Sequence, residues 1–148
     1  MAKREHPMLF LMKSSLQRIG IGRVIRVTSM TLLAVVIYGG WAWCANLGEP
    51  QRVAFRAAAT QGGTSGLSTL FTSSLVELVF ARIGISWLGI AASATIPPTL
   101  TGLMHGIAQW LVGTPNILVT ILPSVVMGYV FAGIYTTGLA RVVQQNTF

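Results

Sequence analysis

The sequence contains no aspartate, and its only acids are Glu5, Glu49 and Glu77. The absence of aspartate excludes Ser-His-Asp catalysis and aspartate-rich metal–phosphate sites, and Glu77, the one acid in a long apolar segment, cannot form a carboxylate pair. The two histidines, His6 and His105, lie on opposite sides of the first long apolar run and cannot form a histidine cluster for a metal. We therefore expect no enzyme activity, no metal site and no cofactor.

Cysteine and charge are also scarce. Cys44 is the only cysteine, so the chain has no internal disulfide and no cysteine-based metal site. Charged residues make up 9% of the 148 residues and hydrophobic residues make up 53%, whereas soluble domains have about 25% charged residues. This composition excludes a water-soluble core and indicates an integral membrane protein.

Most of the positive charge lies at the start of the chain. Six of the ten lysines and arginines precede Val27, where the first long apolar run begins. Because no zinc spacing and no basic, aromatic strand pattern accompanies them, they indicate a membrane surface and not nucleic acid. Residues 1–26 are predicted to form either a basic amphipathic helix on an anionic leaflet or an unstructured basic leader. The residues expected to contact lipid headgroups there are Lys13, Arg18, Arg23 and Arg26.

The remaining sequence predicts an all-α membrane bundle, residues 27–141, with about four transmembrane helices. The predicted spans are residues 27–45, 63–81, 84–112 and 117–140, and residues 142–148 form a polar tail. The third segment is long for one crossing, and Pro97-Pro98 lies at its middle. It is therefore either one kinked crossing or a re-entrant pair of half-helices.

A short polar connection separates the first two spans. Pro50 is expected to open a short helix on the outer membrane surface, and Gly62-Gly63 is expected to end it. This helix carries Arg52 and Arg56, and a pair of arginines can hold a phosphate or a lipid headgroup.

Polar residues recur every four positions through the second predicted span. They are Gln61, Ser65, Thr69, Ser73 and Glu77. Four-residue spacing predicts one shared helix face, and lipid would reject such a face, so protein or water must cover it. An ionised acid at membrane depth costs at least ~2.5 kcal/mol. Glu77 is thus either a surface-seeking or ion-paired acid or a protonatable site on a polar pathway.

The third predicted span supplies the other candidates. His105 is either a single histidine bonded to a neighbouring helix or part of a proton relay through water and hydroxyl groups. Prolines free backbone carbonyls, and broken helices of this kind form ligand sites in many transporters, although simple kinks are also common. Thr99 and Thr101 follow the prolines and are the candidate pathway residues there.

Two classes of function fit these patterns, and the first is the predicted one, because five polar positions are more than a single interhelical contact needs. The first is a small transporter or lipid-handling module with a polar crevice lined by the second and third spans. The second is a non-catalytic accessory or assembly subunit of a larger membrane complex, with its polar face hidden against a partner. Both predict association, either with further copies or within a complex. Positive-inside placement predicts a bacterial inner membrane protein with both termini cytoplasmic.

Overall fold

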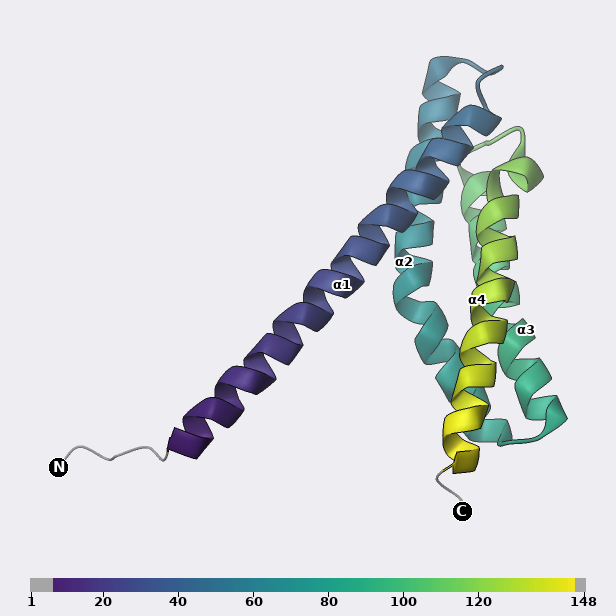
Figure 1. The fold of residues 1–148 in the computed structure, drawn as a ribbon. Helices are drawn as coiled ribbons and strands as arrows, with labels where there is room; N and C mark the ends of the chain where they lie inside the picture. The colour runs from purple at the N-terminus through teal and green to yellow at the C-terminus, as the bar shows by residue number, and fades with distance from the viewer. Residues whose placement is uncertain (1–6, 146–148) are drawn as a thin grey trace. The chain divides into compact units, whose positions relative to one another are not determined.

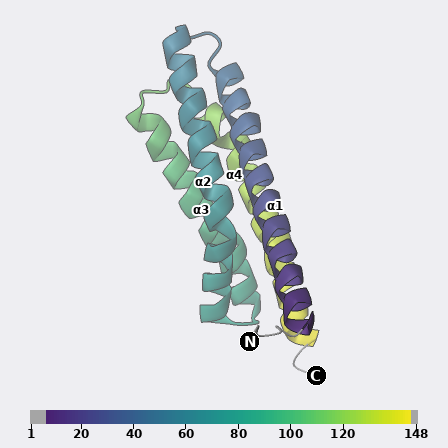
Figure 2. The same cartoon turned by 90° about the vertical axis from the view of Figure 1, so that its left-hand side faces the viewer.

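The computed structural model describes residues 7–145, with side chains described for residue 25 and residues 27–145, and these residues form helices joined by short turns. Its helices are α1 (Pro7–Ala45), α2 (Gln51–Ile83), α3 (Trp87–Leu111) and α4 (Ile117–Gln145). Figure 1 and Figure 2 show α2, α3 and α4 side by side. The predicted all-α fold is confirmed.

The first helix is longer than one span. α1 has 39 residues, so its first part continues the predicted span 27–45 towards the N-terminus without a break. The side chains of Lys13, Arg18, Arg23 and Arg26 lie outside the described residues, and an amphipathic character of this segment stays a prediction. The chain divides into two compact units, Met1–Met30 and Thr31–Phe148, and every contact described below lies within the second unit.

Three of the helices are long and apolar enough to cross a membrane. They are residues Val27–Ala45 of α1, the whole of α2 and the whole of α4. They are consistent with an integral membrane protein. α3 has 25 residues and is about 37 Å long at ~1.5 Å per residue, and it is not among these three helices.

The second unit is built around three packed helices. α3 runs in the direction opposite to α2 and α4 and packs on both, and α2 also contacts α4. The turns formed by residues 46–50 and 112–116 lie at one end of these helices, which we call the upper end (Figure 1). The turn of residues 84–86 lies at the opposite, lower end.

Side chains from α1 tie its last turns to α4 at the upper end. The Trp41 Nε1 donates a hydrogen bond to the Val119 carbonyl at 2.8 Å. The buried Asn46 amide donates to the Thr120 Oγ1 at 2.9 Å and to the Ala42 carbonyl at 2.8 Å. The polar residues at the turn therefore join two helices that are far apart in sequence.

The predicted start of the second helix was wrong. α2 begins at Gln51 and continues through Gly62-Gly63, so no separate surface helix precedes the span. A Cβ on Gly62 would lie 2.9 Å from the Val35 carbonyl oxygen of α1, whereas a Cβ on Gly63 would meet nothing within 4 Å. Gly62 therefore permits a close helix–helix approach and does not end a helix.

The prolines also lie within continuous helices. Pro97 and Pro98 are inside α3, and Pro123 is inside α4. The structure therefore has one helix where the sequence allowed two half-helices. α4 also continues to Gln145, beyond the predicted end at residue 140. Gly113, with a φ of 69°, follows α3 in a conformation that favours glycine.

The interior is small and polar, and the large apolar side chains point outward. The buried hydrophobic residues are mainly alanines, joined by Val76 and Phe80, while glutamine, asparagine, serine, threonine and histidine side chains are also buried. By contrast, Leu118 is 80% exposed. Since lipid provides no hydrophobic force between helices, close packing and hydrogen bonds hold such a bundle together.

Candidate functional site

Two glutamines join the three packed helices near the upper end. The side chains of Gln61 on α2 and Gln109 on α3 are both 0% exposed. The Gln109 Nε2 donates to the Gln61 Oε1 at 3.1 Å and to the Ala57 carbonyl at 3.0 Å. The Gln61 Nε2 donates to the Ser124 Oγ of α4 at 2.8 Å, and Thr114 donates to the Gln109 Oε1. We call Gln61, Gln109, Thr114 and Ser124 the glutamine network.

The His105 ring lies between two hydroxyl groups of α2. The Thr64 Oγ1 is 2.7 Å from its Nδ1, and the Ser68 Oγ is 3.1 Å from its Nε2. The Thr64 hydroxyl also lies 2.8 Å from the Thr60 carbonyl, and the Ser68 hydroxyl lies 2.9 Å from the Thr64 carbonyl. The predicted hydrogen bond from His105 to a neighbouring helix is therefore present, and the ring makes two such bonds to α2, one with Thr64 and one with Ser68.

The number of hydrogens at this ring limits its chemistry. A hydroxyl group has one hydrogen, and a neutral imidazole has one N–H group and one accepting nitrogen. With a neutral His105 ring, either Thr64 or Ser68 must donate to the ring and give up its backbone carbonyl. With a charged ring, both nitrogens donate and both hydroxyls keep their carbonyls. The site therefore accommodates either protonation state by rotation of one hydroxyl.

The five polar residues spaced by four positions along α2, from Gln61 to Glu77, do not lie on one helix face as predicted. Ser65 is buried beside Gln61, Ser73 is half-buried, and Thr69 and Glu77 are exposed. At 3.6 residues per turn, each four-residue step turns about 40° further around the helix. Four such steps carry the row from the buried position of Gln61 to the exposed position of Glu77, which still contacts α4. The expectation of a single shared face is therefore corrected.

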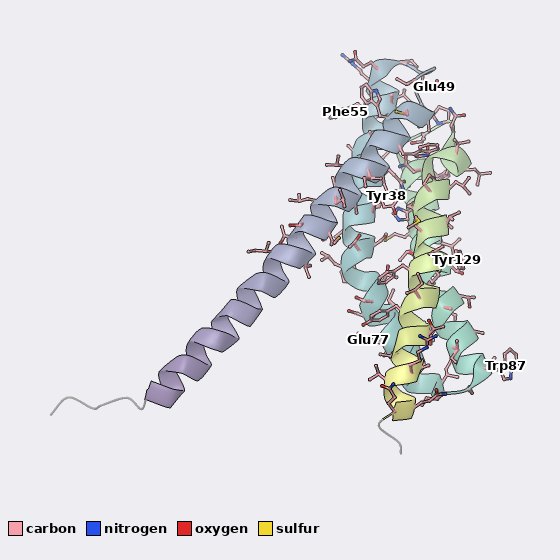
Figure 3. The ribbon with its side chains drawn as sticks, viewed as in Figure 1. Tyr38, Glu49, Phe55, Glu77, Trp87 and Tyr129 are labelled. Atoms are coloured by element: carbon pink, nitrogen blue, oxygen red, sulfur yellow. The ribbon has the colours of Figure 1, made fainter. Side chains whose placement is uncertain are left out.

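Glu77 lies on the exposed half of this row. Its Oε1 accepts a hydrogen bond from the Tyr135 hydroxyl of α4. Figure 3 shows Glu77 in the lower half of the packed helices. Among the residues with described side chains, no lysine or arginine forms an ion pair with it. Ser68, which contacts His105, precedes Glu77 by nine residues, or about 13 Å along the helix. His105 and Glu77 are therefore separate sites joined only by the length of α2.

The hydroxyls next to the prolines have partners in the structure. The Thr99 Oγ1 lies 2.7 Å from the Tyr129 hydroxyl of α4 and 2.7 Å from the Thr95 carbonyl. The Thr101 Oγ1 donates to the carbonyls of its own helix, at 3.2 Å from Pro97. Thr99 is thus a contact between helices, whereas Thr101 bonds within α3.

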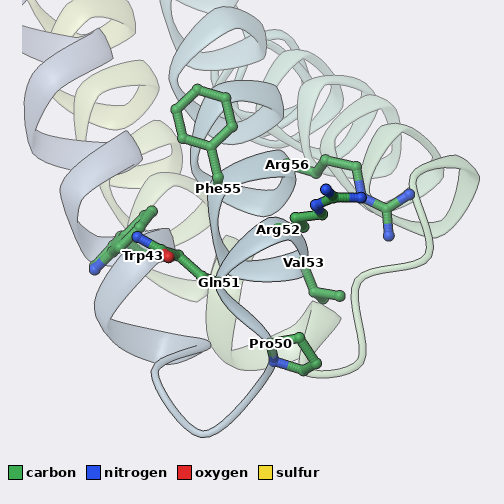
Figure 4. Close-up of a pocket in the computed structure, with 7 residues that line it drawn as sticks. All are labelled: Trp43, Pro50, Gln51, Arg52, Val53, Phe55 and Arg56. Carbon is green, nitrogen blue, oxygen red and sulfur yellow. The ribbon is translucent and has the colours of Figure 1, made fainter.

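Arg52 and Arg56 lie apart from all of these residues, at the upper end. They line an open pocket of about 740 Å³ at the turn between α1 and α2 (Figure 4). Figure 4 shows both guanidinium groups on the same side of α2, while Trp43 and Phe55 lie towards α1. The structure therefore separates the predicted headgroup residues from the predicted pathway residues.

Sequence reasoning missed several residues of this site. Gln109, Thr64, Ser124 and Tyr135 were not among the predicted site residues. The signal for Gln109 was present, because it follows His105 by four residues in an apolar segment and a helix places both on one side. Ser124 and Tyr135 gave no such signal, since their roles depend on the alignment of α4 with α2.

Comparison with known proteins identifies no relative. No protein-family model matches the chain, and neither a curated protein nor a solved structure matches it. Within the described part of the chain, no group of three or more histidine, cysteine or acidic residues is placed to hold a metal ion. We therefore infer the function from the geometry of the polar residues.

Proposed function

We propose that this protein is a non-catalytic integral membrane subunit that assembles with a partner protein in the plane of the membrane. The observation that carries the proposal is the division of the polar row on α2. Gln61 and Ser65 are buried and hydrogen-bonded, whereas Thr69 and Glu77 are exposed. Lipid rejects an exposed acid at membrane depth, and a partner protein removes that cost.

The burial of Gln61 and Ser65 supports a structural role for these residues over a role in a transport pathway. Each glutamine in the network bonds to side chains of neighbouring helices, and Gln61 and Gln109 expose no surface. Two pockets have linings that do not include these glutamines, one at the α1–α2 turn and one lined by α3 and α4. Side chains that fill one another's hydrogen-bonding capacity lock helices together.

The proposed topology has four crossings, with α3 as the fourth. α3 packs on α2 and on α4, and it shares their depth if they cross the membrane. Both termini then lie on one side, which we assign to the cytoplasm because six of the ten basic residues precede Val27. The basic leader lies on the anionic leaflet, and the membrane is a bacterial inner membrane.

Photo-crosslinking in native membranes tests this proposal. A benzophenone amino acid is placed at Thr69, and the control is Leu118, which is 80% exposed on α4. We expect Thr69 to give a protein adduct of defined mass and Leu118 to give none. An adduct of twice the chain mass identifies a second copy, and any other mass identifies a different subunit. Crosslinks to lipid alone at Thr69 would contradict assembly.

One observation favours a second candidate, a transport module. The His105 ring between Thr64 and Ser68 adjusts to either protonation state by rotation of a hydroxyl, as a proton-handling site requires. Single cysteines at positions 61, 65, 69, 73 and 77, in a Cys44→Ala background, separate the two candidates. A transport pathway predicts that a water-soluble thiol reagent labels position 65 from both sides. The assembly subunit predicts protection at positions 61 and 65.

A further inference from the structure

The turn between α1 and α2 forms a pocket with two arginines and two aromatic side chains. The lining residues of this pocket are Trp43, Pro50, Gln51, Arg52, Val53, Phe55 and Arg56. Its volume is about 740 Å³, and it is open to the outside. A cavity of this size is within the range of small-molecule sites, which is roughly 300–1,000 Å³.

The charges in this pocket are unbalanced. Arg52 and Arg56 are exposed and are one helical turn apart, and both line this pocket (Figure 4). Among the residues with described side chains, no carboxylate forms an ion pair with either arginine, although Glu49 lies just before the helix. Like charges at this spacing destabilise a helix. A bound anion would remove that repulsion.

The type of side chain selects the anion. A guanidinium group binds phosphate oxygens through two parallel N–H bonds, which a lysine cannot do. The exposed Phe55 ring and the half-buried Trp43 ring line the same pocket and offer apolar surface beside the arginines. A phosphate joined to acyl chains uses both kinds of surface, whereas a free phosphate uses only the arginines. Tryptophan is also the residue typical of the level of lipid headgroups.

We propose that this pocket binds the phosphate group of an anionic phospholipid, with Arg52 and Arg56 holding the phosphate and Phe55 contacting the start of an acyl chain. If the topology proposed above holds, this site lies on the outer leaflet. The arginines are then exceptions to the positive-inside rule, and lipid binding gives a physical reason for their position. The proposal does not depend on assembly with a partner, since no residue of the pocket belongs to the exposed half of α2.

Thermal unfolding of the full chain in neutral detergent tests the site. Phosphatidylglycerol is titrated into the wild type, into R52Q/R56Q, and into the control R82Q/R141Q. The control removes the same charge from two exposed arginines far from the pocket. We expect phosphatidylglycerol to raise the melting temperature of the wild type and of the control at similar concentrations. R52Q/R56Q should require at least tenfold more lipid for the same rise.

Parallel titrations separate the sources of phosphate. Inorganic phosphate without lipid should give little stabilisation, and Phe55→Ala should weaken the response to phosphatidylglycerol while leaving the response to phosphate unchanged. Equal responses to both ligands, each lost in R52Q/R56Q, would identify a free-phosphate site and overturn the lipid assignment. Equal weakening in R52Q/R56Q and in the control would reduce the effect to net charge and overturn the site.

A conservative variant covers the case in which R52Q/R56Q does not fold. R52K/R56K keeps both charges and lacks the guanidinium fork, so it should fold. It should require at least about threefold more phosphatidylglycerol than the wild type for the same rise in melting temperature. Wild-type affinity in R52K/R56K would contradict recognition by the fork. The basic N-terminal segment is present in every variant, and its contribution cancels in each comparison.

Discussion

Replacing Gln109 with methionine removes one amide from the centre of the glutamine network and leaves the side-chain volume almost unchanged. The Gln109 amide makes three hydrogen bonds, two from its Nε2 and one to its Oε1. Hydrogen bonds between membrane helices contribute on average ~0.6 kcal/mol each, so the three together contribute about 2 kcal/mol. The Gln61 Oε1, which the Gln109 Nε2 reaches, would remain buried without that donor. We therefore expect Gln109→Met to lower the free energy of unfolding by about 2–3 kcal/mol.

Reversible unfolding in mixed micelles measures this change, and Gln144→Met, on the exposed end of α4, is the control. The control should lie within about 0.5 kcal/mol of the wild type. A double-mutant cycle with Gln61→Met adds a sharper criterion. Because each single change leaves the other amide without its partner, the double change should cost less than the sum, by about 0.5 kcal/mol or more. Additive costs, or a Gln109→Met variant as stable as the control, would refute the network.

Two further pairs of variants test the packing, each by the same unfolding measurement. Gly62→Ala should lower the free energy of unfolding by about 1–3 kcal/mol, because its Cβ would meet the Val35 carbonyl at 2.9 Å. Gly63→Ala should be neutral or stabilising by up to about 1 kcal/mol, and similar costs at both positions would contradict the close approach of α1 and α2. Thr136→Val should stabilise the protein by about 1 kcal/mol, since the buried Thr136 hydroxyl has no partner. Thr137→Val, on the exposed side, serves as its control, and a clear loss of stability in Thr136→Val would mean that the hydroxyl has a partner such as a bound water.

The parts of the fold that were predictable are those that depend on hydropathy alone. A span near residues 27–45 and a long apolar helix from residue 117 follow from runs of apolar residues. The start of α2 did not follow, because Gly62 and Gly63 are adjacent and locally alike. Only the position of Val35 on α1 distinguishes the glycine that packs from the glycine that faces open space. Their different roles arise from tertiary contact and not from local preference.

The candidate site was predictable in its residue types and not in its pairings. The spacing of Gln61 and Ser65, and of His105 and Gln109, marks the polar sides of two helices. The partner of each residue depends on how far one helix slides along the next, and a shift of one turn would replace Ser124 by another residue. The predicted single face for the polar residues from Gln61 to Glu77 was wrong for a geometric reason. A row of residues spaced by four winds around a helix that has 3.6 residues per turn.

The two halves of α2 therefore differ in how far their polar side chains find partners within the chain. In the upper half, the side-chain amides of Gln61 and Gln109 are hydrogen-bonded to each other, and Gln61 also bonds to Ser124 of α4. These bonds offset the desolvation of the two buried amides. In the lower half Glu77 has one described partner, the Tyr135 hydroxyl, and remains exposed. If the lower half of α2 lies in the membrane, as we propose, a carboxylate with one hydrogen bond retains part of its desolvation cost. A bundle that served only its own stability would gain by replacing Glu77 with an apolar residue, so the presence of this acid argues for a second component that contacts the lower half of α2.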